Sequence, residues 1–289
     1  MFFDFHTIHP LGTIVLWLLF SYTTSVQFAL YYIKVHINAL TSNVGAFYEK
    51  GGYMIRTIIW FAYFWIKLVL FIPSFFKAKK INDPIQRSNY ADKRARNYMG
   101  SLLKLAGCKV SVEGLENVPV DQAVLFVCNH QSNFDIPLMI TQLPGKKGFI
   151  AKVETLKLPI IRDWMKYMNC VFMDRSDIRQ QVKSITEGVN ILKSGHSMVI
   201  FPEGTRSEDG HLLEFKPGGM KLATKSGVPI VPVTINRSMD LMKKGTSKIT
   251  PAHVTIIISP AIEITDEMNR ETVKLTEDVK AIIASKLML

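Results

Sequence analysis

The sequence of 289 residues lacks the features of several common enzyme classes. No Gly-x-Ser-x-Gly elbow occurs, so the nucleophilic serine of an α/β-hydrolase is missing. The histidines show no metal-ligand spacing, and no glycine motif for nucleotide binding is convincing. The three cysteines, Cys108, Cys128 and Cys170, lie in or beside apolar runs, which indicates buried, reduced thiols. We therefore expect neither a metal nor an organic cofactor.

Acidic side chains are scarce, since there are 24 Asp and Glu against 35 Lys and Arg, and the net charge is +11. Seven Lys or Arg and two Asp lie between Lys77 and Arg96. A basic cluster beside a hydrophobic segment is typical of the cytoplasmic side of a membrane and attracts anionic headgroups. No nucleic acid partner is expected, because no recognised binding motif accompanies the charge. A solvated helix face and linker is the other explanation of the cluster, and it is compatible with a membrane protein.

Two long apolar segments precede this cluster. Leu11 to Ile33 contains no charged residue, and Thr57 to Phe76 is interrupted only by Lys67. Both are rich in Trp and Tyr, which favour the membrane interface. A cleaved signal peptide is not expected, because no Lys or Arg precedes the first segment. The segments predict a membrane-embedded arm of two helices, with two buried helices of a soluble protein as the alternative.

The rest of the chain alternates apolar strand patterns with helical patterns, which predicts an α/β fold with a largely parallel sheet flanked by helices. The expected strands are 109–112, 123–128, 148–151, 170–173, 198–201, 230–234 and 254–258. The expected helices are 92–106, 159–168, 178–192, 217–226 and one from Asp266 to Leu287. In the third of these, an apolar stripe from Ile178 through Val182 to Leu192 is expected to be core. The predicted domains are membrane helices at 1–76, a basic juxtamembrane segment at 77–96 and a catalytic domain at 97–289.

A histidine and an aspartate follow the strand at 123–128. His130 and Asp135 would lie about 16 Å apart in an extended chain at ~3.3 Å per residue, and on different faces of a continuous helix. Only a compact turn brings them together. There Asp135 can fix the tautomer of His130, so that the second imidazole nitrogen removes a proton from a hydroxyl that arrives with the substrate. The ordinary alternative is a loop histidine followed by an aspartate that caps the next helix.

A second polar motif, Pro202 to Ser207, follows the strand at 198–201. Gly204 permits close backbone approach, Arg206 offers a planar fork for phosphate, and Thr205 adds a hydroxyl. The motif therefore predicts an anion site. The alternative is a surface turn with an ion pair between Glu203 and Arg206, which contributes little when exposed.

Charged residues also follow two other expected strands. Lys152 and Glu154 come after 148–151, and Arg175 comes after 170–173. Ligands of open α/β sheets bind outside the carboxyl ends of the strands, so these groups and His130 are expected to share one site. A base beside three cations suits a phosphorylated acceptor. For Lys152 or Arg175 taken singly, a solvated surface charge is the more common situation.

The His-x-x-x-x-Asp block, the Phe-Pro-Glu-Gly-Thr-Arg-Ser block and the segment Val228 to Val233 resemble motifs of the glycerolipid acyltransferases, particularly the bacterial 1-acyl-sn-glycerol-3-phosphate acyltransferases. The resemblance spans roughly Tyr90 to Ile264. A further motif of that family corresponds to Asn169 to Arg175, with Asn169 in place of a glycine. Asparagine tolerates left-handed backbone angles, so the turn is expected to persist.

The resemblance implies acyl transfer from acyl-CoA or acyl-acyl carrier protein to the sn-2 hydroxyl of lysophosphatidic acid. The apolar segments and the basic cluster predict that the enzyme works among membrane lipids, with its catalytic domain at the cytoplasmic face of the cell membrane. His130 and Asp135 would be catalytic. The expected substrate-binding residues are Lys152, Arg175, Glu203, Gly204, Thr205 and Arg206. Two alternatives remain: a related enzyme that uses glycerol-3-phosphate or another lysophospholipid, and a non-enzymatic membrane lipid-binding protein.

Overall fold

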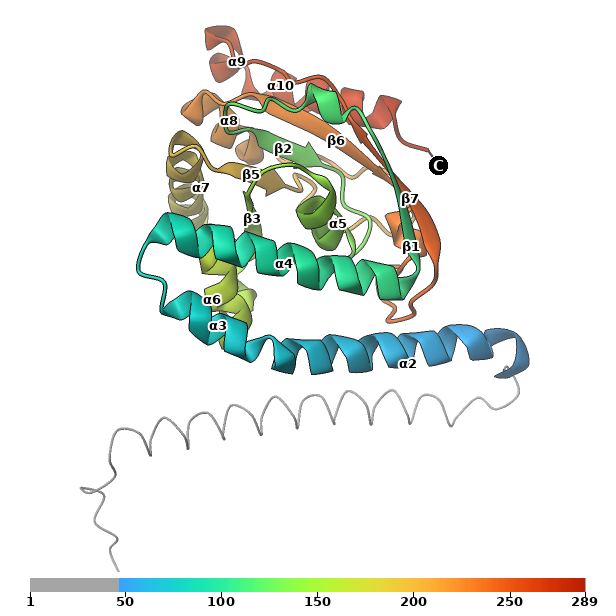
Figure 1. The fold of residues 1–289 in the computed structure, drawn as a ribbon. Helices are drawn as coiled ribbons and strands as arrows, with labels where there is room; N and C mark the ends of the chain where they lie inside the picture. Colours follow the sequence, from blue (N-terminus) through green and yellow to red (C-terminus); the bar gives the residue numbers. More distant parts are fainter. Residues whose placement is uncertain (1–46, 289) are drawn as a thin grey trace, which may run out of the picture. The chain divides into compact units, whose positions relative to one another are not determined.

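The central sheet places the two polar motifs on neighbouring strands. The structure, a computed structural model, describes residues 47–288, and in this range seven strands form one sheet in the order β1-β7-β6-β2-β5-β3-β4 (Figure 1). The strands are β1 (Cys108–Glu113), β2 (Leu125–Cys128), β3 (Lys147–Lys152), β4 (Val171–Met173), β5 (Ser197–Ile200), β6 (Ile230–Asn236) and β7 (Ala252–Ile258). All neighbouring pairs are parallel except β6 and β7. The predicted largely parallel α/β sheet is confirmed.

Helices cover both faces of this sheet. They are α2 (Phe47–Leu70), α3 (Ile72–Lys79), α4 (Pro84–Ala106), α5 (Asp135–Gln142), α6 (Pro159–Tyr167), α7 (Ile178–Lys193), α8 (Lys221–Ser226), α9 (Asp266–Arg270) and α10 (Thr272–Ser285). Short 3-10 turns occur at η2 (Leu115–Asn117), η3 (Val153–Lys157), η4 (Pro217–Met220) and η5 (Ser238–Asp240). In β2, Phe126 and Cys128 pack into the core beneath α4 and α5, whereas Leu125 and Val127 pack into the core beneath α7, α8 and α10. This burial on both faces explains why β2 is a continuous apolar run.

Local signals set most element boundaries. The helix expected from Asp92 begins at Pro84, because Asp83 caps it by accepting a hydrogen bond from the amide of Ile85. It ends as predicted at Gly107, whose φ of 77° is left-handed. Asn169 has a φ of 56°, so the asparagine does hold the left-handed turn before β4. The last expected helix is divided into α9 and α10.

The predicted apolar stripe of α7 is core only in its second half. Val189 and Leu192 are buried, but Ile178 and Val182 are 76 % and 60 % exposed. The 16 residues of α7 span about 24 Å, whereas its neighbours β4 and β5 have three and four residues and span roughly 10–13 Å. The first turns of α7 therefore extend beyond the sheet, and the expectation for Ile178 and Val182 was wrong.

The second apolar segment forms α2 and α3. Together they contain a stretch from Tyr53 to Lys79 that is long and apolar enough to cross a membrane, and 17 % of its most apolar window is buried. One side of α2 packs along α4, where the indole of Trp60 donates a hydrogen bond to the carbonyl of Leu102 at 2.9 Å. The other side is exposed. The first apolar segment, Leu11 to Ile33, lies outside the described residues, and the predicted boundary between residues 76 and 77 falls inside α3.

A lysine is buried at the amino end of β3. Lys147 is 1 % exposed, and its ammonium group donates to the carbonyls of Leu143 at 3.0 Å and Gly145 at 2.8 Å. Arg96 donates to the same two carbonyls and pairs with Asp92. Burial, with the nearby charge of Arg96, lowers the pKa of Lys147 from 10.5 to about 7.

We expect Lys147 to make folding more favourable as the pH rises from about 7 toward 10.5. In that window the unfolded chain still binds the proton that the folded protein has lost, so the free energy of unfolding increases with pH. Relative to Lys147→Met, the free energy of unfolding of the wild type should increase by up to about 1.4 kcal/mol per pH unit, the value for one proton. Denaturant unfolding of both proteins at several pH values measures the difference, and parallel profiles would contradict it.

Candidate active site

The turn after β2 brings His130 and Asp135 together. Nδ1 of His130 lies 2.8 Å from Oδ2 of Asp135, which is the first residue of α5. The same oxygen accepts the amide hydrogens of Gln131 at 2.7 Å and Ser132 at 2.8 Å, and the aspartate is fully buried. Because a carboxylate only accepts, Nδ1 carries the hydrogen and Nε2 is left with a free lone pair. Asp135 does not cap α5, since its donors precede that helix.

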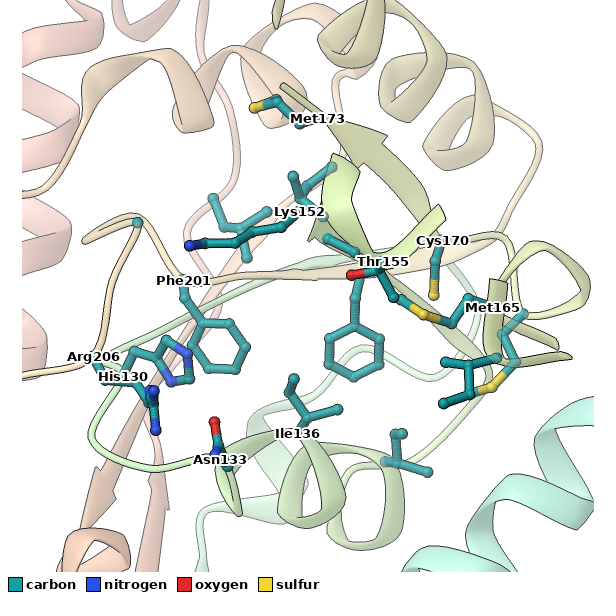
Figure 2. Close-up of a pocket in the computed structure, with 18 of the residues that line it drawn as sticks. His130, Asn133, Ile136, Lys152, Thr155, Met165, Cys170, Met173, Phe201 and Arg206 are labelled. Atoms are coloured by element: carbon teal, nitrogen blue, oxygen red, sulfur yellow. The ribbon is translucent and has the colours of Figure 1, made fainter. Parts of the chain in front are cut away.

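The motif after β5 holds His130 in place. The imidazole stacks on the ring of Phe201 with centroids 4.2 Å apart (Figure 2). The main-chain amide of His130 donates to Oε1 of Glu203 at 2.7 Å, and its carbonyl accepts from the amide of Ser207 at 2.8 Å. The two motifs predicted from separate strands therefore form one structural unit.

Glu203 was expected to bind substrate, but its side chain is buried. It is 4 % exposed, and its second oxygen accepts from the amide of Leu213 at 3.0 Å. Its side chain does not line the cavity described below. In the described part of the chain no ion pair joins it to Arg206, so the alternative of a surface ion pair is wrong.

A cavity of about 710 Å³ opens beside His130. Its polar wall combines groups that follow the carboxyl ends of four strands, β2, β3, β4 and β5. The polar residues that line the cavity include His130, Asn133, Lys152, Arg175, Thr205, Arg206 and Lys216, and Gly204 lies among them. In Figure 2 the side chains of His130, Asn133 and Arg206 lie at one end of the cavity. Six of the eight predicted site residues therefore line the cavity. Asp135 and Glu203 do not line it but accept hydrogen bonds from His130, and Glu154, which was also expected at this site, lies outside the cavity wall.

Two cations flank Gly204. Its φ is 72°, and a Cβ atom added there would lie 3.3 Å from Nζ of Lys216 and 3.6 Å from Nη1 of Arg175. That same guanidinium donates to the carbonyl of Gly204, which ties the β4 loop to the β5 loop. Burial lowers the pKa of Arg175. A side chain at position 204 would meet both cations and a backbone angle that L-residues avoid.

Sequence reasoning missed three residues of the polar end. Lys216 is distant from both motifs, and its only local signal is the helix start at Pro217 that follows it. Asn133 was read only as an unspecified position between His130 and Asp135. Phe201 was assigned to a strand, whereas β5 ends at Ile200 and the ring supports the imidazole.

The opposite end of the cavity is apolar. Apolar residues line the cavity mainly from helices α2, α4, α5 and α6 and from strand β3, and they include Phe64, Leu68, Phe71, Tyr98, Ile136, Ile140, Phe149, Ile160, Trp164, Met165, Met168 and Cys170. Figure 2 shows Met165 and Cys170 at this end, away from His130. Thus α2 contributes to the cavity as well as to the exposed apolar surface.

Neither of the buried thiols has the properties of a nucleophile. Cys128 is fully buried, and burial together with the charge of Asp135 raises its pKa well above the ordinary value. Burial raises the pKa of Cys170 to about 12. Because the thiolate is the reactive form, both cysteines are inert at neutral pH, as expected for core residues.

The fold and this site define an α/β acyltransferase domain, and the Acyltransferase family model matches residues 109–236. The chain is 33 % identical over 241 residues to a 1-acyl-sn-glycerol-3-phosphate acyltransferase of Chlamydomonas reinhardtii, covering 81 % of this chain and 70 % of the relative. It is 30 % identical over 185 residues to the enzyme of the same name from Borreliella burgdorferi, covering 64 % and 74 %. The crystal structure of the 1-acyl-sn-glycerophosphate acyltransferase of Thermotoga maritima matches with a TM-score of 0.64 and 30 % identity, covering 79 % of this chain and 96 % of that one. The chain belongs to the 1-acyl-sn-glycerol-3-phosphate acyltransferase family.

Proposed function

We propose that this enzyme transfers a fatty acyl group from an acyl thioester to the sn-2 hydroxyl of 1-acyl-sn-glycerol-3-phosphate and forms phosphatidic acid. The observation that carries the proposal is the cavity itself, in which His130 and Arg206 lie at one end and apolar side chains such as Met165 lie at the other. Such a cavity suits an acceptor with a phosphate and a donor with a hydrocarbon chain. The names of the relatives support the same acceptor.

In the proposed reaction His130 acts as general base. Its Nε2 removes the proton of the sn-2 hydroxyl as the oxygen attacks the thioester carbonyl. Asp135 holds the imidazole and stabilises the imidazolium, as its 2.8 Å contact allows. Backbone amides of the motif loops stabilise the tetrahedral oxyanion, which collapses, breaks the carbon–sulfur bond and releases the thiol with the proton from His130. No protein nucleophile is needed.

The cationic end would hold the acceptor phosphate. Arg206 offers two parallel N–H donors to phosphate oxygens, and Lys152 and Arg175 add positive charge. Thr205 contributes a hydroxyl, and Gly204 keeps the wall open between Arg175 and Lys216. The apolar end would receive the acyl chain of the donor, whose carrier is coenzyme A or acyl carrier protein.

The exposed side of α2 would enter the cytoplasmic leaflet of the membrane. Beyond this helix, three cations at the junction of α3, α4 and α6 lie over aromatic rings, and the described residues give none of the three an ion pair. The pairs are Lys77 over Tyr90, Arg87 over Tyr167 and Arg94 over Phe71, at 5.6, 5.3 and 5.4 Å from the ring centroids. Cations without carboxylate partners beside an apolar helix suit anionic headgroups. This arrangement supports a position at a negatively charged surface.

Serine substitutions at Ile55, Ile59 and Ile66 test this placement. These α2 side chains are 62 %, 51 % and 59 % exposed, so the triple variant should fold but lose apolar contact with lipid. We expect activity on phospholipid vesicles to fall several-fold more than activity on detergent-dispersed substrate. Serine at the exposed Ile178 and Val182 of α7 is the matched control and should change neither. An equal loss in both assays would contradict the membrane role of α2.

The acceptor is tested by an assay of the purified protein in detergent with several acceptors. Lysophosphatidic acid should be acylated fastest, because it supplies both the phosphate and the free sn-2 hydroxyl. Glycerol-3-phosphate and lysophospholipids with larger headgroups are the comparison, and each is assayed with acyl-CoA and with acyl-acyl carrier protein. Faster acylation of glycerol-3-phosphate or of another lysophospholipid would replace the proposed acceptor by that compound.

A further inference from the structure

The main chain of His130 is held by hydrogen bonds with the loop that follows β5. Its amide donates to Glu203 at 2.7 Å, and its carbonyl accepts from Ser207 at 2.8 Å. Asp135 fixes the imidazole, but it belongs to the same short turn as His130. The main chain of His130 is therefore tied to the segment from Phe201 to Ser207, whereas Asn129 and Ser132 tie the same turn to Ile235 and Met242.

Glu203 is fully occupied by these structural contacts. Its two oxygens accept two main-chain amides, from His130 and from Leu213, and its side chain neither reaches the cavity nor pairs with a described cation. Burial, with the charge of Asp135, raises the pKa of this carboxyl. A carboxylate is costly to bury at such a place, and the two N–H donors offset part of that cost.

We propose that Glu203 is a positioning residue, which sets the distance between His130 and the anion-binding loop and does not contact substrate. A glutamate at position 203 lies one residue before Gly204 and three before Arg206, so its bond to His130 links the proposed base and the proposed phosphate ligand through few rotatable bonds. Its bond to Leu213 fixes the far end of the same loop.

A carboxylate is the side chain that satisfies both donors. Glutamine has the same shape, but it presents one oxygen and one NH₂ group, so one of the two facing amides loses its acceptor. Aspartate keeps the charge but is shorter by one methylene and cannot maintain both contacts without movement of a loop. The reaction that Glu203 supports is the proposed acyl transfer, and the inference rests on it. The first measurement is nevertheless made on the free protein.

Hydrogen–deuterium exchange of the full-length protein in detergent, without substrate, tests the contact directly. In Glu203→Gln we expect the amide of either His130 or Leu213, whichever loses its acceptor, to exchange about tenfold faster, the ratio for loss of roughly one hydrogen bond. Peptides from β6 should keep wild-type exchange, which shows that the sheet is intact. Should Glu203→Gln fail to fold, Glu203→Asp is measured in the same way with the same expectation.

Steady-state kinetics with the preferred acceptor then distinguishes a positioning role of Glu203 from a role in substrate binding. We expect kcat of Glu203→Gln to fall about tenfold to hundredfold, the scale of a small misplacement of a reacting group, with an almost unchanged acceptor KM. Glu208→Gln and Glu214→Gln are matched controls, because these glutamates lie on the same loop with side chains 80 % and 85 % exposed. Wild-type exchange at both His130 and Leu213 combined with a raised acceptor KM would overturn the proposal and make Glu203 a substrate ligand. A different preferred acceptor would overturn the proposed function alone and leave the exchange result standing.

Discussion

Replacing His130 with alanine is expected to lower the rate of acyl transfer by about 10²–10⁴, the usual contribution of general acid–base catalysis. The described structure offers no substitute, because His130 lines the cavity with a free Nε2 and both buried thiols are inert. Folding and membrane binding should persist, since His130 is not among the buried core residues. The measurement is the steady-state rate of the purified variant, with thermal unfolding as the check of folding.

The neighbouring aspartate gives a less clean test. Asp135 accepts three hydrogen bonds and is fully buried, so Asp135→Asn should lower stability as well as rate. His253→Ala is the matched control, because His253 is an exposed histidine that bonds Ser111 on β1 and does not line the cavity. Near-normal turnover in a folded His130→Ala protein would exclude the proposed base.

Replacing Arg206 with alanine is expected to raise the acceptor KM by roughly ten- to hundredfold. The cost is that of a charge-assisted hydrogen bond, about 1.5–3 kcal/mol. The guanidinium lines the polar end of the cavity and has no carboxylate partner among the described residues, so it is available to a ligand. Initial rates over a range of lysophosphatidic acid concentrations measure the effect.

Lysine at position 206 should restore only part of the affinity, since an ammonium group lacks the planar fork that binds two phosphate oxygens. Arg270→Ala is the control, because Arg270 belongs to α9 and lies outside the cavity wall. Loss of acyl-donor affinity with unchanged acceptor kinetics would mean that the loop binds the donor and not the acceptor phosphate.

Short-range patterns predicted the geometry that local chemistry controls. The four-residue spacing between His130 and Asp135 required a turn, and the turn forms because one carboxylate oxygen gathers three donors. The left-handed angle of Asn169 was foreseeable for a similar reason, since few residue types tolerate it. The convergence of strand ends followed from the general rule for parallel sheets.

Features that depend on distant contacts could not be predicted in this way. Lys216 reaches the site only because its segment folds back beside Gly204. The contribution of α2 to the cavity depends on how Trp60 packs against α4. Ile178 and Val182 are exposed because α7 is longer than the two short strands beside it. The helical periodicity of the sequence gives no information about those strand lengths. Glu203 was expected to bind substrate because a motif gives residue identity without side-chain direction.

The most direct test of the proposed reaction is the position of the new acyl chain in the product. Purified enzyme is incubated with 1-acyl-sn-glycerol-3-phosphate and a labelled acyl thioester, and the phosphatidic acid is then digested with an sn-2-specific lipase. We predict that the label is released as free fatty acid and that His130→Ala forms this product at least about a hundredfold more slowly. Label retained at another position, or phosphatidic acid formed by His130→Ala at the wild-type rate, would contradict the proposed mechanism.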